Sequence, residues 1–276
     1  MAFADWHPPA PVGVLRRNGF ARLSDLAAAD YADAIRAMEA FQSAFLASTR
    51  PLWVPDFPIP ADALAHFSRQ WEYPYAWTNV SGAPGRVLDA GSGITFFPYL
   101  LSAAGFDVDC CDNDDSLGLH ARFARASELT GCGVRFTGSS LTSDLPFDEE
   151  AFDAVVCISV LEHLGSAAAG AVARLTRVLR AGGRLVLTCD VDLRREGDLL
   201  VEDLALVIAE IRNTCELVHA LDLTRPHDLL TSDAFLRSDA WRLPWPWRPP
   251  PGVAQPPAEF RSLAVVGLTA RKRASA

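Results

Sequence analysis

The stretch RVLDAGSGITFFPYLL, residues 86–101, decides the fold of this protein. It begins as a short apolar strand, meets Gly91 and Gly93, and continues as an apolar segment with the character of a helix. Glycines at a strand-to-helix turn let a ligand approach the exposed backbone N–H groups, because glycine carries no side chain. The stretch therefore predicts a ligand site at the carboxyl end of a strand, of the kind that nucleotides occupy.

Apolar strands alternate with amphipathic helices on the carboxyl side of this stretch. Such strands pair in parallel through right-handed crossovers, so we predict an α/β fold with a doubly wound sheet. The expected strands are 86–90, 107–111, 133–137, 153–158, 183–189, 216–222 and 263–271, and the expected helices are 94–104, 115–130, 166–180 and 199–213.

Residues 1 to about 80 differ in composition and are rich in alanine, proline and aromatic residues. Ser24 is placed to cap a helix from about Asp25 to Leu46, and a shorter helix is expected near residues 61–71. We predict an N-terminal helical cap or lid over residues 1–80 and a ligand-binding domain over residues 81–276. Within that domain, residues 223–262 form a long connection that we expect to cover the substrate side.

Composition limits the partners. The chain has 276 residues and a formal net charge of −9 without a basic stripe, which argues against a nucleic-acid groove. No apolar run is long enough for a membrane span and no secretory signal is visible, so we expect a cytoplasmic protein without a membrane partner. The six cysteines show neither C-x-x-C pairs nor histidines at zinc spacing, which argues against a structural metal. A small molecule is the expected partner, and a homodimer is left open.

A carboxylate follows the next predicted strand. Asp112 lies 21 residues beyond Gly91, where a carboxylate can accept hydrogen bonds from both hydroxyls of a ribose. The alternative is that residues 112–115 are only a polar loop that caps the following helix.

Four motifs occur in an order and spacing that is typical of one family. They are VLDAGSG, CCDND, LPFDEEAFDAVVCISVLEHL and VLRAGGRLVLTCD, and together they resemble the class I S-adenosylmethionine-dependent methyltransferases, of the small-molecule type, over about residues 84–190. The resemblance implies a Rossmann-like, mostly parallel seven-stranded sheet with an antiparallel last strand. It also implies S-adenosylmethionine as cofactor, with its methionine end near Asp89, Gly91 and Gly93 and its ribose on Asp112.

The resemblance places the adenine between the ends of the second and third strands. Many relatives carry an aspartate before LPF, whereas this chain has GSSLTSD. Ser139 or Ser140 is therefore expected to bond the adenine amino group, and Leu141 to form an apolar slot; the alternative is a solvent-exposed polar loop. The predicted cofactor-binding residues are Asp89, Gly91, Gly93, Asp112, Asn113, Ser139, Ser140, Leu141 and Ser159.

Thr95 stands where relatives commonly have the third glycine of a G-x-G-x-G pattern. Because this position opens the helix, a side chain is tolerated there if it points away from the cofactor. Its hydroxyl is then expected to bond an N–H group at the start of the helix or to lie beside the cofactor carboxylate.

Methyl transfer from a sulfonium relies on orientation, and a base is needed only when the acceptor must lose a proton. His163, in SVLEHLG after the fourth strand, is the predicted base; the alternative is that Glu162 and His163 only shape the entry to the next helix. Asp190 and Asp192 follow the fifth strand, but Ser159 rather than a carboxylate ends the fourth, so no catalytic metal is predicted.

Aromatic residues crowd the stretch QWEYPYAWTNV just before the cofactor domain. Trp71, Tyr73 and Tyr75, together with Trp245 in the long connection, are predicted to bind the substrate. The alternative is that these rings pack the N-terminal helices onto the sheet.

We therefore predict an enzyme that transfers a methyl group to an oxygen or nitrogen of a small organic molecule, with specialised metabolism as the expected setting. The alternative is a protein of this fold that binds S-adenosylmethionine without transferring methyl, as a regulatory partner or a catalyst of another reaction. A nicotinamide-dependent oxidoreductase is disfavoured, because Phe96 stands where that pattern has its third glycine and no Tyr-x-x-x-Lys pair occurs.

Overall fold

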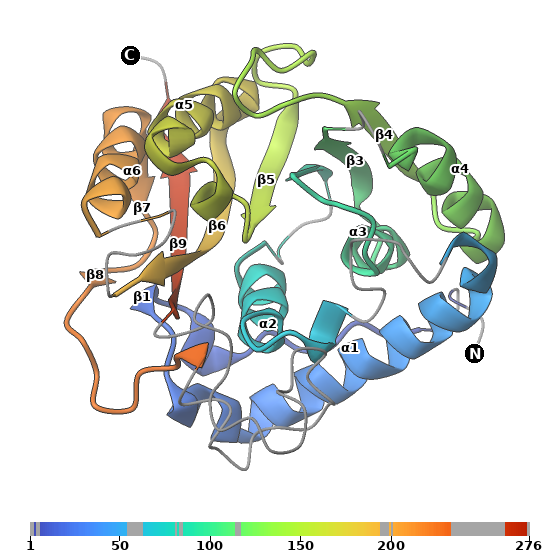
Figure 1. Cartoon of the computed structure of the whole chain (residues 1–276), viewed down its shortest axis with the longest axis horizontal. Helices are drawn as coiled ribbons and strands as arrows, with labels where there is room; N and C mark the ends of the chain where they lie inside the picture. Colours follow the sequence, from blue (N-terminus) through green and yellow to red (C-terminus); the bar gives the residue numbers. More distant parts are fainter. Residues whose placement is uncertain are drawn as a thin grey trace, which may run out of the picture.

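The computed structural model describes residues 3, 6–53, 63–80, 82, 85–113, 117–193, 199, 201–232 and 263–274. Within them, one open sheet has helices on both faces (Figure 1). On one side lie α1 (Ala29–Ser48), α2 (Arg69–Val80), α3 (Phe97–Ala103) and α4 (Leu119–Thr130), and on the other lie α5 (Ala168–Val178) and α6 (Val201–Thr214). None of the described helices combines the length and the apolar character needed to cross a bilayer.

The centre of the sheet is parallel. Its strands are β2 (Arg86–Ala90), β3 (Asp107–Asp112), β4 (Val134–Gly138), β5 (Phe152–Ile158) and β6 (Leu179–Asp192), and β9 (Leu263–Lys272) lies antiparallel to β6. The order β4-β3-β2-β5-β6-β9 shows that the chain extends the sheet first to one side of β2 and then, from β5 on, to the other. A crevice therefore forms at the carboxyl ends of β2 and β5. The predicted doubly wound α/β sheet with an antiparallel last strand is confirmed.

The sheet is longer than the seven strands predicted. β1 (Asn18–Phe20) joins it beside β9, and the expected strand 216–222 is two short strands, β7 (Cys215–Leu217) and β8 (Leu221–Asp222). The break occurs because β7 pairs with β9 whereas β8 pairs with β1. Between them, the Asn18 side-chain amide donates to the His219 carbonyl at 2.8 Å.

All six α-helices of the described residues begin later than expected, and the cause is local in α3 and α1. α3 begins at Phe97 because residues 91–96 form the glycine loop. α1 begins at Ala29, since Leu23–Ala27 form a short 3-10 helix in which the Asp25 carboxylate accepts a hydrogen bond from the Arg22 N–H. Ser24 lies inside this 3-10 helix and does not cap α1.

α2 is the largest departure from the predicted elements. A helix was expected near 61–71, but residues 63–65 form one 3-10 turn and α2 occupies residues 69–80, with eleven of its side chains buried. Pro74 inside α2 lacks the N–H that would bond the Gln70 carbonyl. The Tyr31 hydroxyl donates to that carbonyl at 3.0 Å instead, so α1 replaces the missing backbone bond.

The N-terminal segment and the sheet share one hydrophobic core. Rings from α1 and α2 contact rings of α3: Phe45 lies 4.9 Å from Tyr99 and Tyr73 lies 5.0 Å from Phe97, centroid to centroid. β1 also comes from the N-terminal segment and is part of the sheet. Residues before and after position 80 thus pack in one cluster. The division into a cap of residues 1–80 and a domain of residues 81–276, and the action of the cap as a lid, stay predictions.

Gly267 of β9 provides a test of how tightly α2 packs on the sheet. A Cβ at Gly267 would lie 2.5 Å from Cζ of Tyr75 and 2.8 Å from Cη2 of Trp71. We expect Gly267→Ala to lower the free energy of unfolding by about 1–3 kcal/mol, measured by urea denaturation. The control is Gly133→Ala, where a Cβ meets nothing within 4 Å; equal effects of the two substitutions would contradict close packing.

Candidate functional site

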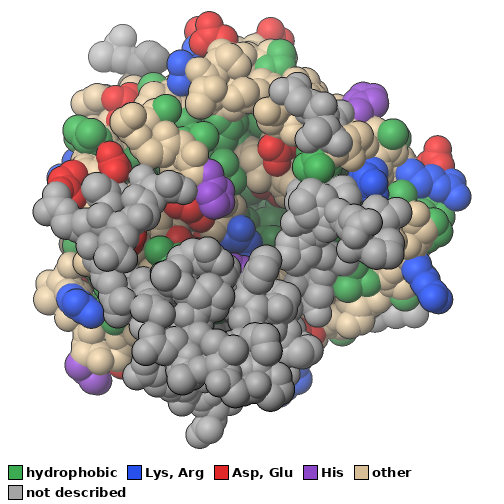
Figure 2. All heavy atoms as spheres, viewed as in Figure 1, with side chains coloured by type: hydrophobic (Ala, Val, Ile, Leu, Met, Phe, Trp, Pro, Cys, Tyr) green, Lys and Arg blue, Asp and Glu red, His purple; other side chains and the backbone are tan. Residues whose placement is uncertain are grey.

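A cavity of about 480 Å³ opens at the carboxyl ends of β2, β3 and β5 and reaches the first turn of α2. Figure 2 shows a hollow near the middle of the surface that faces the viewer, with acidic, basic and histidine side chains visible in it. The volume falls in the range of about 300–1,000 Å³ that is usual for small-molecule sites. A ligand-sized pocket therefore lies at the predicted edge of the sheet.

The loop after β2 depends on glycines in a left-handed conformation. Gly91 has a φ of 73° and Gly93 a φ of 51°, values that residues with side chains rarely adopt. The Gly91 N–H donates to the Cys111 carbonyl at 2.7 Å, which holds the loop against β3. A Cβ at Gly91 would also lie 2.4 Å from Cγ2 of Val160, so backbone conformation and space both exclude a side chain there.

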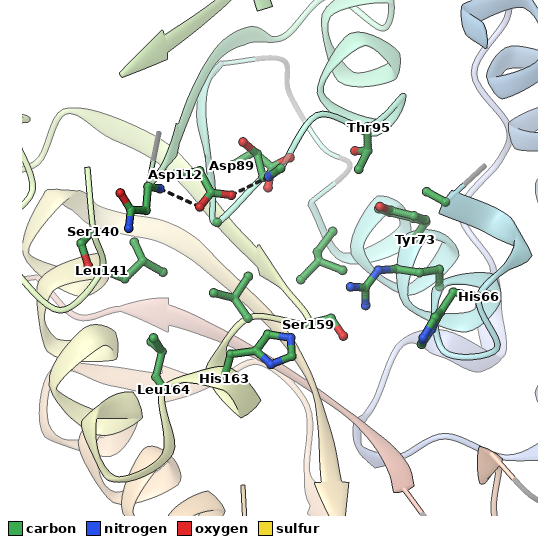
Figure 3. Close-up of a pocket in the computed structure, with 18 of the residues that line it drawn as sticks. His66, Tyr73, Asp89, Thr95, Asp112, Ser140, Leu141, Ser159, His163 and Leu164 are labelled. Carbon is green, nitrogen blue, oxygen red and sulfur yellow. Dashed lines mark hydrogen bonds between the residues drawn. The ribbon is translucent and has the colours of Figure 1, made fainter. Parts of the chain in front are cut away.

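Asp112, at the end of β3, fixes the glycine loop through its side chain. Its Oδ2 accepts a hydrogen bond from the Gly93 N–H and its Oδ1 accepts one from the Asn113 N–H, both at 2.7 Å (Figure 3). A carboxylate oxygen can accept more than one hydrogen bond, so this geometry is compatible with ribose hydroxyls as further donors. The residue at the N-cap of the following helix α4 is Gly118.

Asp89 lies beside this loop in a buried position. Burial and then the Asp112 carboxylate raise the pKa of Asp89 to about 7, against the opposite effect of Arg69. The Ser92 hydroxyl at the same wall is buried and has no hydrogen-bond partner among the described residues. Two carboxylates and an unpaired hydroxyl suit a ligand that carries a cationic group and several hydroxyls, as S-adenosylmethionine does.

All nine residues predicted to bind the cofactor line this one cavity, and they come from the ends of four neighbouring parallel strands. In the loop after β4, the Ser139 N–H donates to the Asp112 carbonyl at 2.8 Å, and Leu141 is buried at the cavity wall. Residues 139–141 therefore line the cavity, whereas residues 142–144 of the same loop are exposed. The contacts of these residues with the cofactor stay a prediction.

The turn after β5 presents a strained serine to the cavity. Ser159 has a φ of 53°, which is unusual for a residue with a side chain, and its N–H donates to the Thr188 carbonyl at 2.9 Å. Its hydroxyl donates to Oε1 of Glu162 at 2.5 Å. Glu162 is buried and His163 is exposed at the cavity rim, so these two neighbours in the sequence face different environments.

Two of the residues predicted to bind the substrate, Trp71 and Tyr75, lie away from this cavity. The Trp71 indole N–H donates to Asp25 at 2.8 Å, the Tyr75 hydroxyl donates to the Arg17 carbonyl at 2.9 Å, and neither side chain lines the cavity. Both rings face Gly267 of β9 instead, and they stack on each other with their centroids 4.6 Å apart. Tyr73 does line the cavity, whereas Trp245 lies outside the described residues.

His66 and Arg69 also line the cavity, and the sequence did not indicate them. Nδ1 of His66 lies 2.9 Å from the Ser68 hydroxyl, and burial, followed by Arg69 and His163, lowers the pKa of His66 to about 3. Arg69 donates to Glu72 at 2.5 Å. The sequence held one signal for Arg69: it stands three residues before Glu72, within an aromatic stretch, as in a charged pair on one helix. The expected helix ended near residue 71, between the two residues, so the pair was not recognised.

Thr95 has the local role that the sequence predicts. Its hydroxyl accepts a hydrogen bond from the Phe97 N–H at 3.4 Å, at the start of α3.

As for metals, no three His, Cys, Asp or Glu side chains of the described residues come together in a way that could hold an ion.

Comparison with known proteins adds the family. A family model described as a methyltransferase domain matches residues 88–187. The solved structure of the [4+2]-cyclase SpnF is 20% identical, with a TM-score of 0.52 over 88% of this chain and 96% of that one. The PH0226 protein of Pyrococcus horikoshii OT3 is 12% identical, with a TM-score of 0.51 over 75% of this chain and 90% of its own. The comparison with curated proteins found no match.

The matched region contains the nine predicted cofactor-binding residues together with His163. The family match and the fold define a class I S-adenosylmethionine-dependent methyltransferase domain. Residues 88–187 thus lie in an S-adenosylmethionine-dependent methyltransferase domain, and S-adenosylmethionine is the cofactor of that domain.

Gly91 should tolerate substitution far less than Thr95. In Gly91→Val the positive φ and the overlap with Val160 add strain of about 3 kcal/mol or more, so we expect affinity for S-adenosylmethionine to fall about 100-fold or more by calorimetry. Thr95→Gly removes the hydrogen bond from the Phe97 N–H and the one with the Tyr73 side chain, but it strains no backbone, and it should change affinity little.

The control for this prediction is Gly105→Ala. Gly105 also has a positive φ, of 93°, but a Cβ there meets nothing within 4 Å and lies away from the cavity lining. This variant carries the backbone strain alone and should retain binding. Circular dichroism verifies that each variant is folded, and a larger loss in Thr95→Gly than in Gly91→Val would mean that the ligand lies elsewhere.

Affinity for the cofactor should depend on pH through Asp89. Its pKa is raised to about 7, and a cationic ligand favours the carboxylate form. Affinity should therefore rise as pH increases from about 6 to about 8, and Asp89→Asn should weaken that dependence. Calorimetry with S-adenosylmethionine at several pH values provides the measurement; an unchanged pH dependence in Asp89→Asn would contradict the assignment.

Proposed function

We propose that this methyltransferase acts on an oxygen or nitrogen of a small organic molecule. The observation that carries the proposal is the division of the cavity into two ends (Figure 3). Asp112, Ser140 and Leu141 lie at one end, and Tyr73 and His66 lie at the other. The first end has the residues predicted for the cofactor, so the second is available for the acceptor.

The size and walls of the second end favour a small acceptor. A cavity of about 480 Å³ in all leaves room for a small organic molecule beside the cofactor but not for a folded macromolecule. Tyr73 supplies an aromatic wall, and α2 beneath it is held by its own buried contacts. We place the acceptor in specialised metabolism, with residues 1–80 as cover of the acceptor side. Most of the 223–262 connection, which the sequence also predicts as a cover, lies outside the described residues.

S-adenosylmethionine supplies an electrophilic methyl group on a sulfonium. The chain binds and orients: Asp89 and the glycine loop for the methionine end, Asp112 for the ribose, and the loop 139–141 for the adenine. Holding two reactants in line accounts for much of the acceleration in such a displacement. His163 at the cavity rim stays the base that the sequence predicts for an acceptor that must lose a proton.

The test is turnover with a panel of phenols, hydroxylated ketones and primary amines. We expect S-adenosylhomocysteine to form in equal amount with a product heavier by one methyl group, measured by mass spectrometry. Gly91→Val serves as the inactive control.

The [4+2]-cyclase named above shows that this fold is compatible with another chemistry. Conversion of a panel compound without S-adenosylhomocysteine would support that alternative class of function. Binding of S-adenosylmethionine with no turnover of any acceptor would support a regulatory role.

A further inference from the structure

Three carboxyl side chains crowd behind the cavity wall. Glu72 comes from α2, Glu162 from the turn after β5 and Asp190 from β6, and their residues are only 0%, 7% and 8% exposed. Among the residues that the structure describes, Arg69 is the cation that acts on them, and it is paired with Glu72 at 2.5 Å. One guanidinium offsets only part of the charge of three buried carboxylates, so the carboxyl groups of the cluster oppose one another's ionisation.

The charge balance of the cluster supports this conclusion. Burial and then Glu72 raise the pKa of Glu162 to about 7, while Arg69 opposes them. Burial, Glu72 and Glu162 raise the pKa of Asp190 well above its usual value. The nearby thiols of Cys157 and Cys189 add no charge, because burial raises their pKa well above the usual range.

The hydrogen bonding of the cluster is incomplete. Oε1 of Glu72, Oε2 of Glu162, Oδ1 of Asp190 and the hydroxyl of the fully buried Thr188 have no partner among the described residues. A buried carboxylate oxygen without a donor is costly, whereas a protonated carboxyl can donate to such a neighbour. The cluster is therefore built to take up a proton at little cost.

Ser159 connects this cluster to the cavity. It lines the cavity, its φ of 53° holds it at the turn after β5, and its hydroxyl donates to Glu162 at 2.5 Å. We propose that Ser159 and Glu162, in place of His163, are the proton-accepting pair of the site, with Ser159 in contact with the acceptor instead of the cofactor and Glu162 as the final holder of the proton. This inference rests on the proposed methyl transfer to an oxygen or nitrogen.

The step balances in atoms and charge. The bond between the acceptor atom and its hydrogen breaks, and that proton goes to Oγ of Ser159 while the serine proton goes to Oε1 of Glu162. The electron pair left on the acceptor atom forms the bond to the methyl carbon, and the pair of the broken carbon–sulfur bond stays on sulfur. One positive charge disappears from the sulfonium as one negative charge disappears from Glu162, so the total charge of the site does not change.

This charge balance predicts a difference between two ligands that needs no acceptor to measure. S-adenosylmethionine carries the sulfonium charge and S-adenosylhomocysteine does not, so only the first ligand favours the carboxylate form of Glu162. Binding of S-adenosylmethionine at pH close to the pKa of Glu162 should release more protons than binding of S-adenosylhomocysteine. Asp89 contributes alike to both, because both ligands carry the same amino-acid end.

The experiment is titration calorimetry of the full chain with each ligand, in two buffers of different ionisation enthalpy. We expect the difference in protons released to be lost in Glu162→Gln and retained in Glu128→Gln, a matched change in an exposed residue of α4. Thermal unfolding verifies that each variant is folded. Equal proton release by the two ligands in the original protein, or loss of the difference in His163→Gln but not in Glu162→Gln, would overturn the proposal.

Ser159→Ala tests the relay itself and keeps the carboxyl group in place. It should retain the proton difference between the ligands, yet lower kcat about 10²–10⁴-fold with an acceptor from the panel. An unchanged kcat in Ser159→Ala would overturn the relay. Two results separate the proposals. Absence of methyl transfer refutes the proposed function. Methyl transfer together with equal proton release by S-adenosylmethionine and S-adenosylhomocysteine refutes only the role of Glu162.

Discussion

The site depends on the burial of α2 between the sheet and the N-terminal segment. A helix buried on every side must satisfy its polar groups within the protein. Here the donors of Trp71 and Tyr75 reach Asp25 and the Arg17 carbonyl, and Tyr31 replaces the bond that Pro74 removes. These contacts fix the rotation of α2, and that rotation brings Arg69 and Tyr73 to the cavity.

The second constraint is electrostatic. Parallel strands end at a common edge, so Asp89 and Asp112 meet there, and Glu72, Glu162 and Asp190 lie behind the neighbouring wall. Arg69 offsets only part of this charge, since its pairing is with Glu72. The protein therefore has a site whose free energy improves when a cation enters, which fits a sulfonium cofactor and links its binding to protonation of the carboxyl groups.

The parts of the fold that sequence predicted are those with local causes. The glycines, Asp112 and the apolar strands of residues 86–190 carry periodicity and turn chemistry within a few residues, and the structure places them as expected. The missed parts depend on tertiary contacts. β1 is three residues long and exists through its pairing with β9 and β8, and Trp71 and Tyr75 face β9 rather than the cavity because of the rotation of α2. His66 and Arg69 reach the site from the same helix region, which no local pattern connects to the glycine loop.

A crystal structure with S-adenosylhomocysteine bound tests the central claim most directly, because it shows which side chains hold each part of the ligand. The account predicts that the ribose hydroxyls donate to Asp112, that the amino-acid end lies beside Asp89, Gly91 and Gly93, and that the sulfur faces the end of the cavity formed by Tyr73, His66 and Ser159. A ligand whose ribose lies away from Asp112, or whose sulfur faces away from Ser159, would contradict it.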